Sequence, residues 1–364
     1  MSSPGSVARD GFLTATEIIA KAHERLSLEA WDYVAGAAES ETTKRRNREA
    51  IEEWVFRPRV LRNVGTVDAA TTLLGTRLRI PVVLAPMGSL ETLAPGGAVN
   101  MVEAAAQFGT LPIVSSVTAP ALEDSAAAAR CDKWFQLYIR GDFTWISEMV
   151  RRIRAAGYAA LVLTVDAAWY SIRDRQLHLR WNPPSRTRGT SGEKFQALLD
   201  WDMVARIKDI AEMPLVLKGI QTAEDAEIAV RQGIDVIYVS NHGGRHLDHA
   251  KGALAMFLEI VERIGQKVPI LVDGGFLRGP DVVKAVALGA AAIGIGRIQA
   301  YAMAADGAKG IIRLLEILEG EMKAAMAMMG VTALAQLDRT LVERIGPPAG
   351  GVDPFPFLPD GIRL

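Results

Sequence analysis

The hydrophobic pattern of the chain changes near residue 80, where short apolar runs begin to alternate with alanine-rich or amphipathic stretches. Runs of this continuity are typical of parallel strands covered on both faces. They are IPVVLAPMG, LPIVSSV, KWFQLYI, ALVLTVD, PLVLKGI, VIYVSNHGG, PILVDGG and AAIGIGR. Glycines that would end the preceding helices stand before several runs, at Gly109, Gly157, Gly233 and Gly289. Eight such units in about 220 residues, with no GxGxxG after the first strand, predict an α/β fold, a single (β/α)8 TIM barrel.

The first 79 residues carry a helical pattern. One helix is expected after a capping box at Thr14 and a second after Ser27. On the second helix Tyr33 points nearly opposite to the apolar face formed by Trp31, Val34, Ala35 and Ala38. Tyr33 therefore faces either solvent or something outside the packing surface of its own helix. We interpret the basic run in the third segment, TTKRRNREAIEEW, as a solvated helix face.

The pattern predicts one domain over residues 1–364. It consists of an N-terminal helical segment (1–79), the barrel strands (80–300), and C-terminal helices with a tail (301–364). Between the fourth and fifth strands, residues 167–213 include WNPPSRTRGTSGEK, which predicts a long loop without regular elements and a candidate lid. The tail GPPAGGVDPFPFLPDG is expected to lie extended along a barrel wall or a neighbouring subunit.

Composition narrows the class of protein. The 41 basic and 42 acidic side chains nearly balance, which gives no reason to propose nucleic acid or an anionic membrane as partner. The only cysteine, Cys131, excludes an internal disulfide and favours a reducing compartment. Its position between a helix-like run and a strand does not suggest a catalytic thiol. Neither a signal peptide nor a membrane-spanning run is recognisable, so we predict a cytoplasmic protein.

Polar residues gather where the predicted strands end. The carboxyl ends of barrel strands share one face, so these residues should converge although they are distant in sequence. Apolar strands that each finish on hydrogen-bonding groups predict a large polar ligand over the barrel mouth, with phosphate near DGGFLRG and GIGR. The strand-end residues are Pro86, Met87, Gly88, Ser115, Ser116, Gln136, Tyr138, Thr164, Asp166, Lys218, Ser240, His242, Arg245, Asp273, Gly274, Gly275, Gly296 and Arg297.

Two of these residues point to specific chemistry. His242, followed by two glycines and by Arg245, is a candidate general base that Asp166 could orient. A metal site formed with His246 and His249 is the alternative, but the glycines disfavour the helix that such spacing needs. Lys218 ends an apolar strand, where it either pairs with an anionic group or extends its long stem to solvent.

With SNHGGR, DGG and GIGR in place, the chain resembles the FMN-dependent α-hydroxy acid oxidases and dehydrogenases, such as glycolate oxidase, lactate oxidase, mandelate dehydrogenase and flavocytochrome b2. The resemblance runs from about Thr14 to the helices after Arg297 and implies roles for single residues. His242 corresponds to the active-site base and Asp166 to its partner. The residues implied to bind substrate are Arg245 and Arg173 at the carboxylate, Tyr33 beside them, and Tyr138 at the substrate oxygen.

The resemblance also implies FMN as cofactor, and from the histidine spacing we expect no metal. Lys218 would lie by N1 and O2 of the flavin. The isoalloxazine and ribityl contacts would come from Pro86, Met87, Gly88, Ser115, Gln136, Thr164 and Ser240, and the ribityl and phosphate contacts from Asp273, Gly274, Gly275, Gly296 and Arg297. The implied reaction oxidises a 2-hydroxy acid to the 2-oxo acid, with electrons passing to flavin N5 and then to oxygen, a quinone or a protein. A homo-oligomer, a tetramer in this family, is implied as well.

Several positions depart from the family pattern. Leu277 stands where an arginine usually meets the flavin phosphate, so either Arg278 or Arg297 must carry more of that charge, or FMN is held more weakly. His246 replaces the usual glutamine. Val117 stands where some members carry a tryptophan, and Gly88 is smaller than the common alanine. Together they should open the pocket, with Trp169 or Tyr170 lining it instead, which favours a substrate larger or more apolar than glycolate. The alternatives are an isomerase on an FMN barrel, which the two arginines disfavour, and an FMN-binding homologue without turnover.

Overall fold

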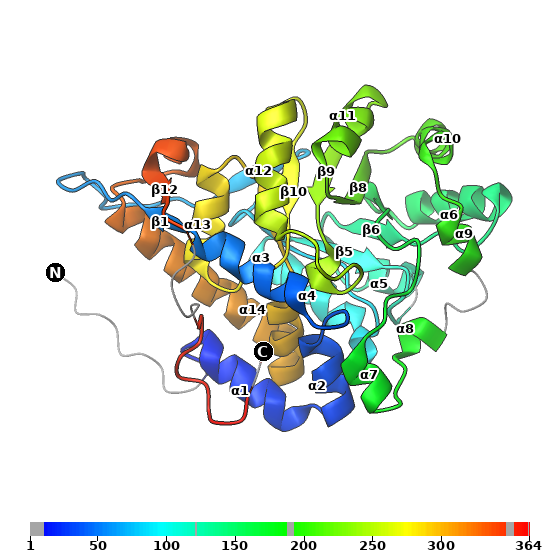
Figure 1. Ribbon diagram of the computed structural model, residues 1–364, viewed down its shortest axis with the longest axis horizontal. Helices are drawn as coiled ribbons and strands as arrows, with labels where there is room; N and C mark the ends of the chain where they lie inside the picture. Colours follow the sequence, from blue (N-terminus) through cyan, green and yellow to red (C-terminus); the bar gives the residue numbers. More distant parts are fainter. Residues whose placement is uncertain (1–10, 121, 188–192, 347–352, 363) are drawn as a thin grey trace.

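The protein is built around a closed barrel of eight parallel strands, seen in a computed structural model that describes residues 11–120, 122–187, 193–346, 353–362 and 364 (Figure 1). Around the barrel the strands follow the order β10-β11-β4-β5-β6-β7-β8-β9. This confirms the predicted (β/α)8 barrel, one strand for each apolar run. The strands are β4 (Val82–Leu84), β5 (Leu111–Ser115), β6 (Trp134–Leu137), β7 (Ala160–Thr164), β8 (Leu215–Ile220), β9 (Val236–Val239), β10 (Ile270–Val272) and β11 (Ala292–Ile295).

The strand sequences explain why the barrel closes. Every residue of β5 to β9 is buried, because one face packs into the barrel and the other against the surrounding helices. Trp134 and Tyr238 are the largest side chains of the interior cluster. A hairpin of β2 (Thr71–Leu73) and β3 (Thr76–Leu78) adds Leu73 and Leu78 to that cluster.

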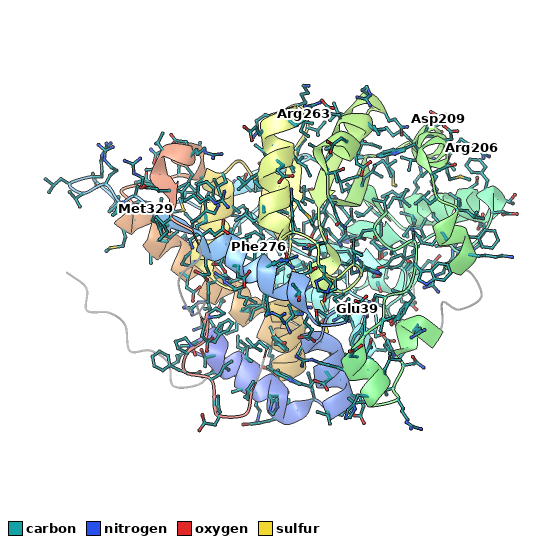
Figure 2. All side chains as sticks on the ribbon, in the orientation of Figure 1. Glu39, Arg206, Asp209, Arg263, Phe276 and Met329 are labelled. Carbon is teal, nitrogen blue, oxygen red and sulfur yellow. The ribbon has the colours of Figure 1, made fainter. Side chains whose placement is uncertain are left out.

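Helices surround the strands. They are α4 (Ala98–Phe108), α5 (Leu122–Ala127), α6 (Phe143–Ala155), α10 (Trp201–Ala211), α11 (Ala223–Arg231), α12 (Ala253–Ile264), α13 (Gly279–Ala287) and α14 (Arg297–Met328). The four glycines expected at helix ends all have positive φ, as predicted. The α14 helix bends at Asp306 and Gly307, which divides it into the two predicted helical stretches. Figure 2 shows Arg206, Asp209 and Arg263 at the outer edge, whereas Phe276 is buried.

Three N-terminal helices lie beside the barrel: α1 (Ala15–Arg25), α2 (Leu28–Ala35) and α3 (Thr42–Glu52). The Thr14 and Ser27 side chains cap α1 and α2 as predicted. The segment before the barrel is not purely helical, however. Besides the hairpin it contains β1 (Trp54–Phe56), which pairs antiparallel with β12 (Val342–Arg344). Only tertiary pairing with a distant strand makes this three-residue segment extended.

The connection between β7 and α10 corrects another prediction. It contains the short helices α7 (Asp174–His178), α8 (Pro184–Thr187) and α9 (Glu193–Ala197). The prediction that WNPPSRTRGTSGEK forms no regular element was therefore wrong on both sides of residues 188–192, which lie outside the described residues. Pro184 opens α8 at a position where proline's fixed φ favours a helix start. In the described chain no helix is both long and apolar enough to cross a membrane.

Single-turn 3-10 helices complete the described elements: η1 (Leu90–Thr92), η2 (His242–Gly244), η3 (Leu334–Gln336) and η4 (Arg339–Leu341). The C-terminal tail, expected to lie along a barrel wall, reaches the rim of the barrel mouth. There Phe355 is fully buried, and the backbone carbonyl of Pro354 accepts a hydrogen bond from Arg278.

Candidate active site

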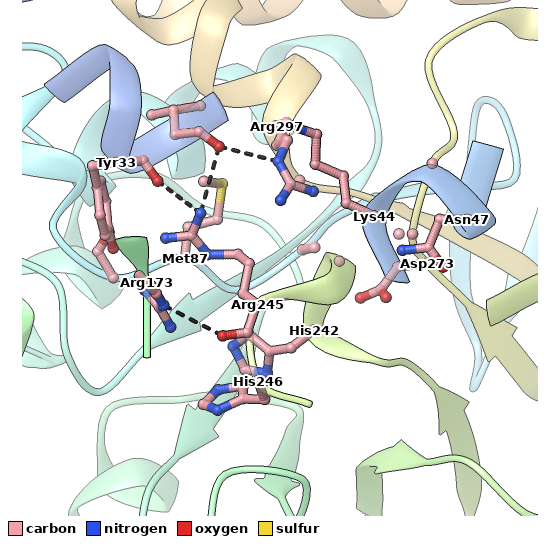
Figure 3. Close-up of a pocket in the computed structure, with 18 of the residues that line it drawn as sticks. Tyr33, Lys44, Asn47, Met87, Arg173, His242, Arg245, His246, Asp273 and Arg297 are labelled. Carbon is pink, nitrogen blue, oxygen red and sulfur yellow. Dashed lines mark hydrogen bonds between the residues drawn. The ribbon is translucent and has the colours of Figure 1, made fainter. Parts of the chain in front are cut away.

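A cavity of about 1160 Å³ opens over the carboxyl ends of the barrel strands (Figure 3). Its walls come from the strand-end loops, from α2 and α3, from the connection after β7, and from the C-terminal tail. The predicted convergence of polar strand ends on one face is therefore observed.

The loop after β9 turns His242 toward this cavity. His242 has a φ of 58°, and Gly243 and Gly244 follow with φ of 65° and 75°. Three successive left-handed residues are accessible here because two of them lack a Cβ. The side chain of Asn241 accepts a hydrogen bond from Gly244 N (3.2 Å), and Ser240 Oγ accepts one from His242 N (3.0 Å). The sequence SNHGG thus builds its own turn.

His242 lies between two hydrogen-bonding partners. Its Nδ1 is 3.1 Å from Asp166 Oδ1, and its Nε2 is 3.2 Å from the hydroxyl of Tyr138. We assign the proton of the neutral ring to Nδ1, because Asp166 can accept it, which leaves the Nε2 lone pair toward the cavity. Burial, together with the charges of Lys218 and the nearby arginines, lowers the pKa of His242 well below 6.5. Burial and Asp166 raise the pKa of Tyr138, which keeps its hydroxyl protonated.

Gly219 allows Asp166 to reach His242. Strand β8 is irregular between Lys218 and Ile220, and Gly219 there has a φ of 109°. A Cβ at this glycine would lie 2.6 Å from Asp166 Cγ. The carboxylate is 2% exposed, and burial raises its pKa although the nearby Lys218 opposes that rise.

Two arginines lie on the same side of the cavity as His242. Arg245 Nη1 donates to the backbone carbonyls of Tyr33 (2.7 Å) and Gly36 (2.8 Å), and its guanidinium lies 4.9 Å from the Tyr33 ring centre. Arg173 Nε donates to Ser171 Oγ (3.1 Å) and to the carbonyl of Arg245 (3.3 Å). In these contacts within the described chain, each arginine uses one edge of its guanidinium. The remaining nitrogens are the donors that a carboxylate would meet.

Tyr33 is buried in the cavity wall, which decides between the two orientations considered from sequence. Its hydroxyl donates to the carbonyl of Gly88 (3.1 Å), and its ring makes an edge-to-face contact with Trp181 (5.7 Å between ring centres). The Tyr33 side chain therefore lies in the wall of the site, beside Arg245.

Lys218 provides a buried cation at the base of the cavity. It is 3% exposed, donates to Ser240 Oγ (3.0 Å), and lies 3.6 Å from Asp273 Oδ2. Nearby, Ser115 and Thr164 both bond to the Gln136 side chain (2.6 and 2.9 Å). These polar groups and Ser240 are buried and are not among the described lining residues. Their direct contact with flavin stays a prediction.

A second set of residues, which we call the phosphate end of the cavity, has the features of a phosphate cradle. Gly274 and Gly275 follow β10 with φ of 96° and 87°, and Gly296 precedes the first turn of α14. Arg297, the first residue of α14, donates to the carbonyls of Val34 (3.1 Å) and Gly36 (2.8 Å). Backbone amides in such turns and at a helix N-terminus favour anions.

Arg278 is not placed as expected. Its guanidinium pairs with Glu321 (2.7 Å) and donates to the Pro354 carbonyl (3.0 Å), and it is not among the described lining residues. A carboxylate on α14 draws this side chain outward, which no local pattern reveals. Leu277 does line the cavity and brings no charge.

The family departures divide into three cases. Val117, Trp169 and Tyr170 line the cavity as expected. The expectation that Gly88 opens space is wrong, because a Cβ there would lie 2.9 Å from Val117 Cγ2 and 3.0 Å from Ser185 Cβ. The third case, His246, packs edge-to-face on His242 with 4.2 Å between ring centres, and its buried Nδ1 has no partner in the described chain.

The remaining histidine of the run, His249, is 67% exposed. No group of three or more potential metal ligands occurs among the described residues. Cys131 is half-buried, and burial raises the pKa of its thiol.

Sequence reasoning missed the contribution of α3. The interpretation of its basic run as a solvated face holds for the exposed Arg45 and Arg46 but was wrong for Lys44 and Arg48, which line the cavity and are each only 16% exposed on their side chains. Helical spacing could have shown this: Lys44 and Arg48 share one face with Asn47 and Ile51, both buried. Gln196 of α9, which donates to the Thr164 carbonyl (2.9 Å), was also missed because it lies near the apparently irregular loop.

A closed barrel with a buried lysine, a glycine cradle and a histidine–carboxylate pair at its mouth belongs to the class of flavin-dependent barrel oxidoreductases. Residues 22–344 match the family model described as FMN-dependent dehydrogenase. The chain is 37% identical over 332 residues to a peroxisomal (S)-2-hydroxy-acid oxidase of Oryza sativa subsp. japonica, covering 86% of this chain and 91% of that protein. It is 32% identical to glycolate oxidase 3 of Arabidopsis thaliana, covering 88% and 93%.

Solved structures similar to this chain include enzymes that act on mandelate. An active chimera of (S)-mandelate dehydrogenase carrying a glycine-to-alanine mutation superposes with a TM-score of 0.87 at 29% identity, covering 92% of this chain and all of that one. A mandelate oxidase with (S)-2-phenylpropionate gives 0.85 at 34%, covering 92% and 98%. The chain belongs to the FMN-dependent dehydrogenase family, and its cofactor is FMN.

The described residues fit that cofactor. Lys218 would hold the pyrimidine edge of the flavin, and the Gly274–Gly275 turn with Arg297 would hold the phosphate. The turn needs glycine at position 275, because a Cβ there would lie 2.8 Å from the carbonyl oxygen of Asn47.

Proposed function

We propose that this enzyme oxidises an (S)-2-hydroxy acid to the 2-oxo acid. The observation that carries the proposal is the convergence of a neutral histidine, hydrogen-bonded to the buried Asp166, with two arginines on one side of the cavity. FMN, when bound, supplies the two-electron acceptor. The protein groups must then bind the carboxylate, orient the carbon that is oxidised, and accept a proton.

Substrate binding would strengthen the base. Lys218, Arg173 and Arg245 lower the pKa of His242 in the free protein. A carboxylate held between the arginines offsets their charge and so raises that pKa, because an opposite charge nearby favours the protonated ring. Asp166 then stabilises the imidazolium formed when Nε2 accepts the proton. Tyr138, protonated and 3.2 Å from Nε2, can donate to the substrate oxygen.

We further propose a substrate with a side chain larger or more apolar than that of glycolate. The support comes from Val117, Met87, Trp169 and Tyr170 in the cavity lining, not from Gly88. The mandelate enzymes among the similar structures carry names consistent with an aryl side chain. A cytoplasmic location, a single domain and a homo-oligomeric assembly stay predictions; the rice relative is named peroxisomal.

The test follows flavin colour under anaerobic conditions. A panel of 2-hydroxy acids, from glycolate to lactate and mandelate, is added to the FMN-loaded protein, and the loss of flavin absorbance is recorded. We expect bleaching, fastest with the bulkier acids. FMN-loaded protein that no 2-hydroxy acid bleaches would contradict the proposed function.

The base assignment is tested in the same assay with His242→Asn. We expect the rate of bleaching to fall by roughly a hundred- to ten-thousand-fold, the usual range for loss of a general base, while FMN remains bound. His249→Asn is the matched control, since that exposed histidine does not line the cavity. Bleaching by His242→Asn at the wild-type rate would remove His242 from this role.

A further inference from the structure

The two side chains at positions 277 and 278, which follow the glycine cradle in sequence, bring no positive charge to the phosphate end of the cavity. Leu277 is apolar, and Arg278 is engaged by Glu321 and the Pro354 carbonyl. Arg297 remains, one cation for a phosphate that carries close to two negative charges at neutral pH. A further cation must come from an element outside the barrel strands.

Helix α3 brings Lys44 to this end. Figure 3 shows its side chain extending from α3 toward Arg297. The amine donates to the carbonyl of Ala35 (3.0 Å) and pairs with Glu41 (2.7 Å). Glu41 also forms an ion pair with Arg175, whose Nε lies 2.8 Å from Glu41 Oε1. One carboxylate is thus divided between two cations.

Lys44 and Arg297 are like charges held close together in a largely buried place. Burial and the charge of Arg297 lower the pKa of Lys44 to about 8. Burial likewise lowers the pKa of Arg297. Two cations forced together in this way are stabilised when an anion binds between them.

The other cations of α3 are less suited to this role. Arg48 is bound to Asp281 through both terminal nitrogens (2.7 and 2.8 Å) and donates to the Gly275 carbonyl (2.9 Å). Arg45 is exposed and donates to the Ser40 carbonyl and to Thr42 Oγ1. Lys44 combines burial, a flexible stem and a partially shared counterion.

We propose that Lys44 binds the phosphate of FMN together with Arg297 and supplies the charge that Leu277 lacks. This inference rests on the assignment of the glycine cradle to the FMN phosphate. It does not depend on which substrate is oxidised, so binding experiments without turnover test it separately from the proposed function.

The experiment compares FMN with riboflavin, which shares the ring and ribityl chain but has no phosphate. The flavin is stripped from the full-length protein, and each ligand is titrated by quenching of flavin fluorescence. Lys44→Met should weaken FMN by on the order of tenfold or more, as for loss of a hydrogen bond between charged groups, and leave riboflavin within about twofold. Lys44→Arg should retain most of the FMN affinity.

Arg46→Met is the matched control. It removes one positive charge from the same helix, where the side chain is exposed and donates to the carbonyls of His249 and Ala250. It should leave the ratio of FMN to riboflavin affinity unchanged. Adding Leu277→Arg to Lys44→Met should restore FMN binding, because it returns a cation to the same end of the cavity.

An unchanged affinity ratio in Lys44→Met, or equal losses for the two ligands, would overturn the assignment. Should Lys44→Met fail to fold, Lys44→Gln gives the same ratio, and the same two outcomes decide. Absence of any FMN binding by the wild-type protein would instead contradict the cofactor assignment itself.

Discussion

His242 owes its chemistry to the charges around it as much as to its own ring. Lys218 and the arginines disfavour the imidazolium, while Asp166, 3.1 Å from Nδ1, is the group that can stabilise it. The ring therefore stays neutral in the free protein and becomes a stronger base when an anion reaches the arginines. Recognition of the carboxylate and activation of the base are then one electrostatic event.

This arrangement predicts the pH profile of the free enzyme. A histidine with a lowered pKa stays neutral below pH 6.5, and it loses its ability to accept a proton only as pH falls through the lowered value. We expect kcat/KM to hold its plateau below pH 6.5 and then decline in acid. Arg173→Met removes one of the charges that lower the pKa, so its acid limb should move to higher pH.

The measurement is kcat/KM for a 2-hydroxy acid between pH 4.5 and 9, a range chosen around the ordinary histidine pKa of about 6.5. Arg175→Met is the control, because Arg175 pairs with Glu41 and Asp32 and does not line the cavity. A wild-type acid limb at or above pH 6.5 would contradict the electrostatic account.

At the scale of elements, the contact between η2 and α3 sets the site. Gly244 has a φ of 75°, and a Cβ there would lie 2.6 Å from the backbone nitrogen of Lys44. The carbonyl of Gly244 also accepts a hydrogen bond from Ala38 N (2.9 Å). The base-bearing turn thus approaches the backbone of α3 closely at Gly244, and the Asn241 and Asn47 side chains add hydrogen bonds of 2.7 and 3.0 Å between them.

Gly244→Ala should therefore separate α3 from η2. The left-handed φ alone costs about 1–2 kcal/mol, and the clash with Lys44 adds to it. Gly233→Ala is matched in φ (69°) but has open space around its Cβ, so it should lose only the backbone part. Thermal denaturation and FMN titration check both variants. Equal losses of thermal stability and FMN affinity in the two variants would show that the close contact between Gly244 and Lys44 contributes to neither quantity.

At the scale of the whole molecule, the segments that precede and follow the barrel in sequence pair with each other. The β1–β12 pair joins residues near position 55 to residues near 343, and the C-terminal tail continues to the cavity rim. Phe355 is fully buried there, with the Arg278 guanidinium 5.6 Å from its ring centre. Because tail residues line the cavity together with residues of the connection after β7, we expect the tail to help close the cavity over the cofactor.

Phe355→Ala should release this tail. Deleting a buried phenylalanine typically costs about 3–5 kcal/mol, and Phe355 is the one fully buried side chain among the described residues of this segment. We expect faster loss of FMN and faster proteolysis within residues 353–364. Phe357→Ala, in the same segment but 86% exposed, should leave both rates unchanged. Similar behaviour of the two variants would contradict a closing role for the tail.

The sequence by itself determined the barrel and much of its mouth. Continuous apolar runs can only be buried on both faces, and parallel strands bring their carboxyl ends together on one face. The hydrophobic pattern alone therefore places four polar residues on that face, namely His242, Asp166, Tyr138 and Lys218. The SNHGG turn is also predictable, because its conformation depends on its own glycines and on Asn241.

Only the tertiary structure decided contacts between elements distant in sequence. Glu321 draws Arg278 away from the cavity, Ser185 fills the space beside Gly88, and β12 makes β1 extended. Helical spacing places Lys44 on one face of α3 with Asn47 and Ile51, but only the packing of α3 over η2 shows that this face turns toward the cavity. The physical reason is the same in each case: a local pattern shows that a side chain is polar or apolar, whereas its partner is set by packing of the whole chain.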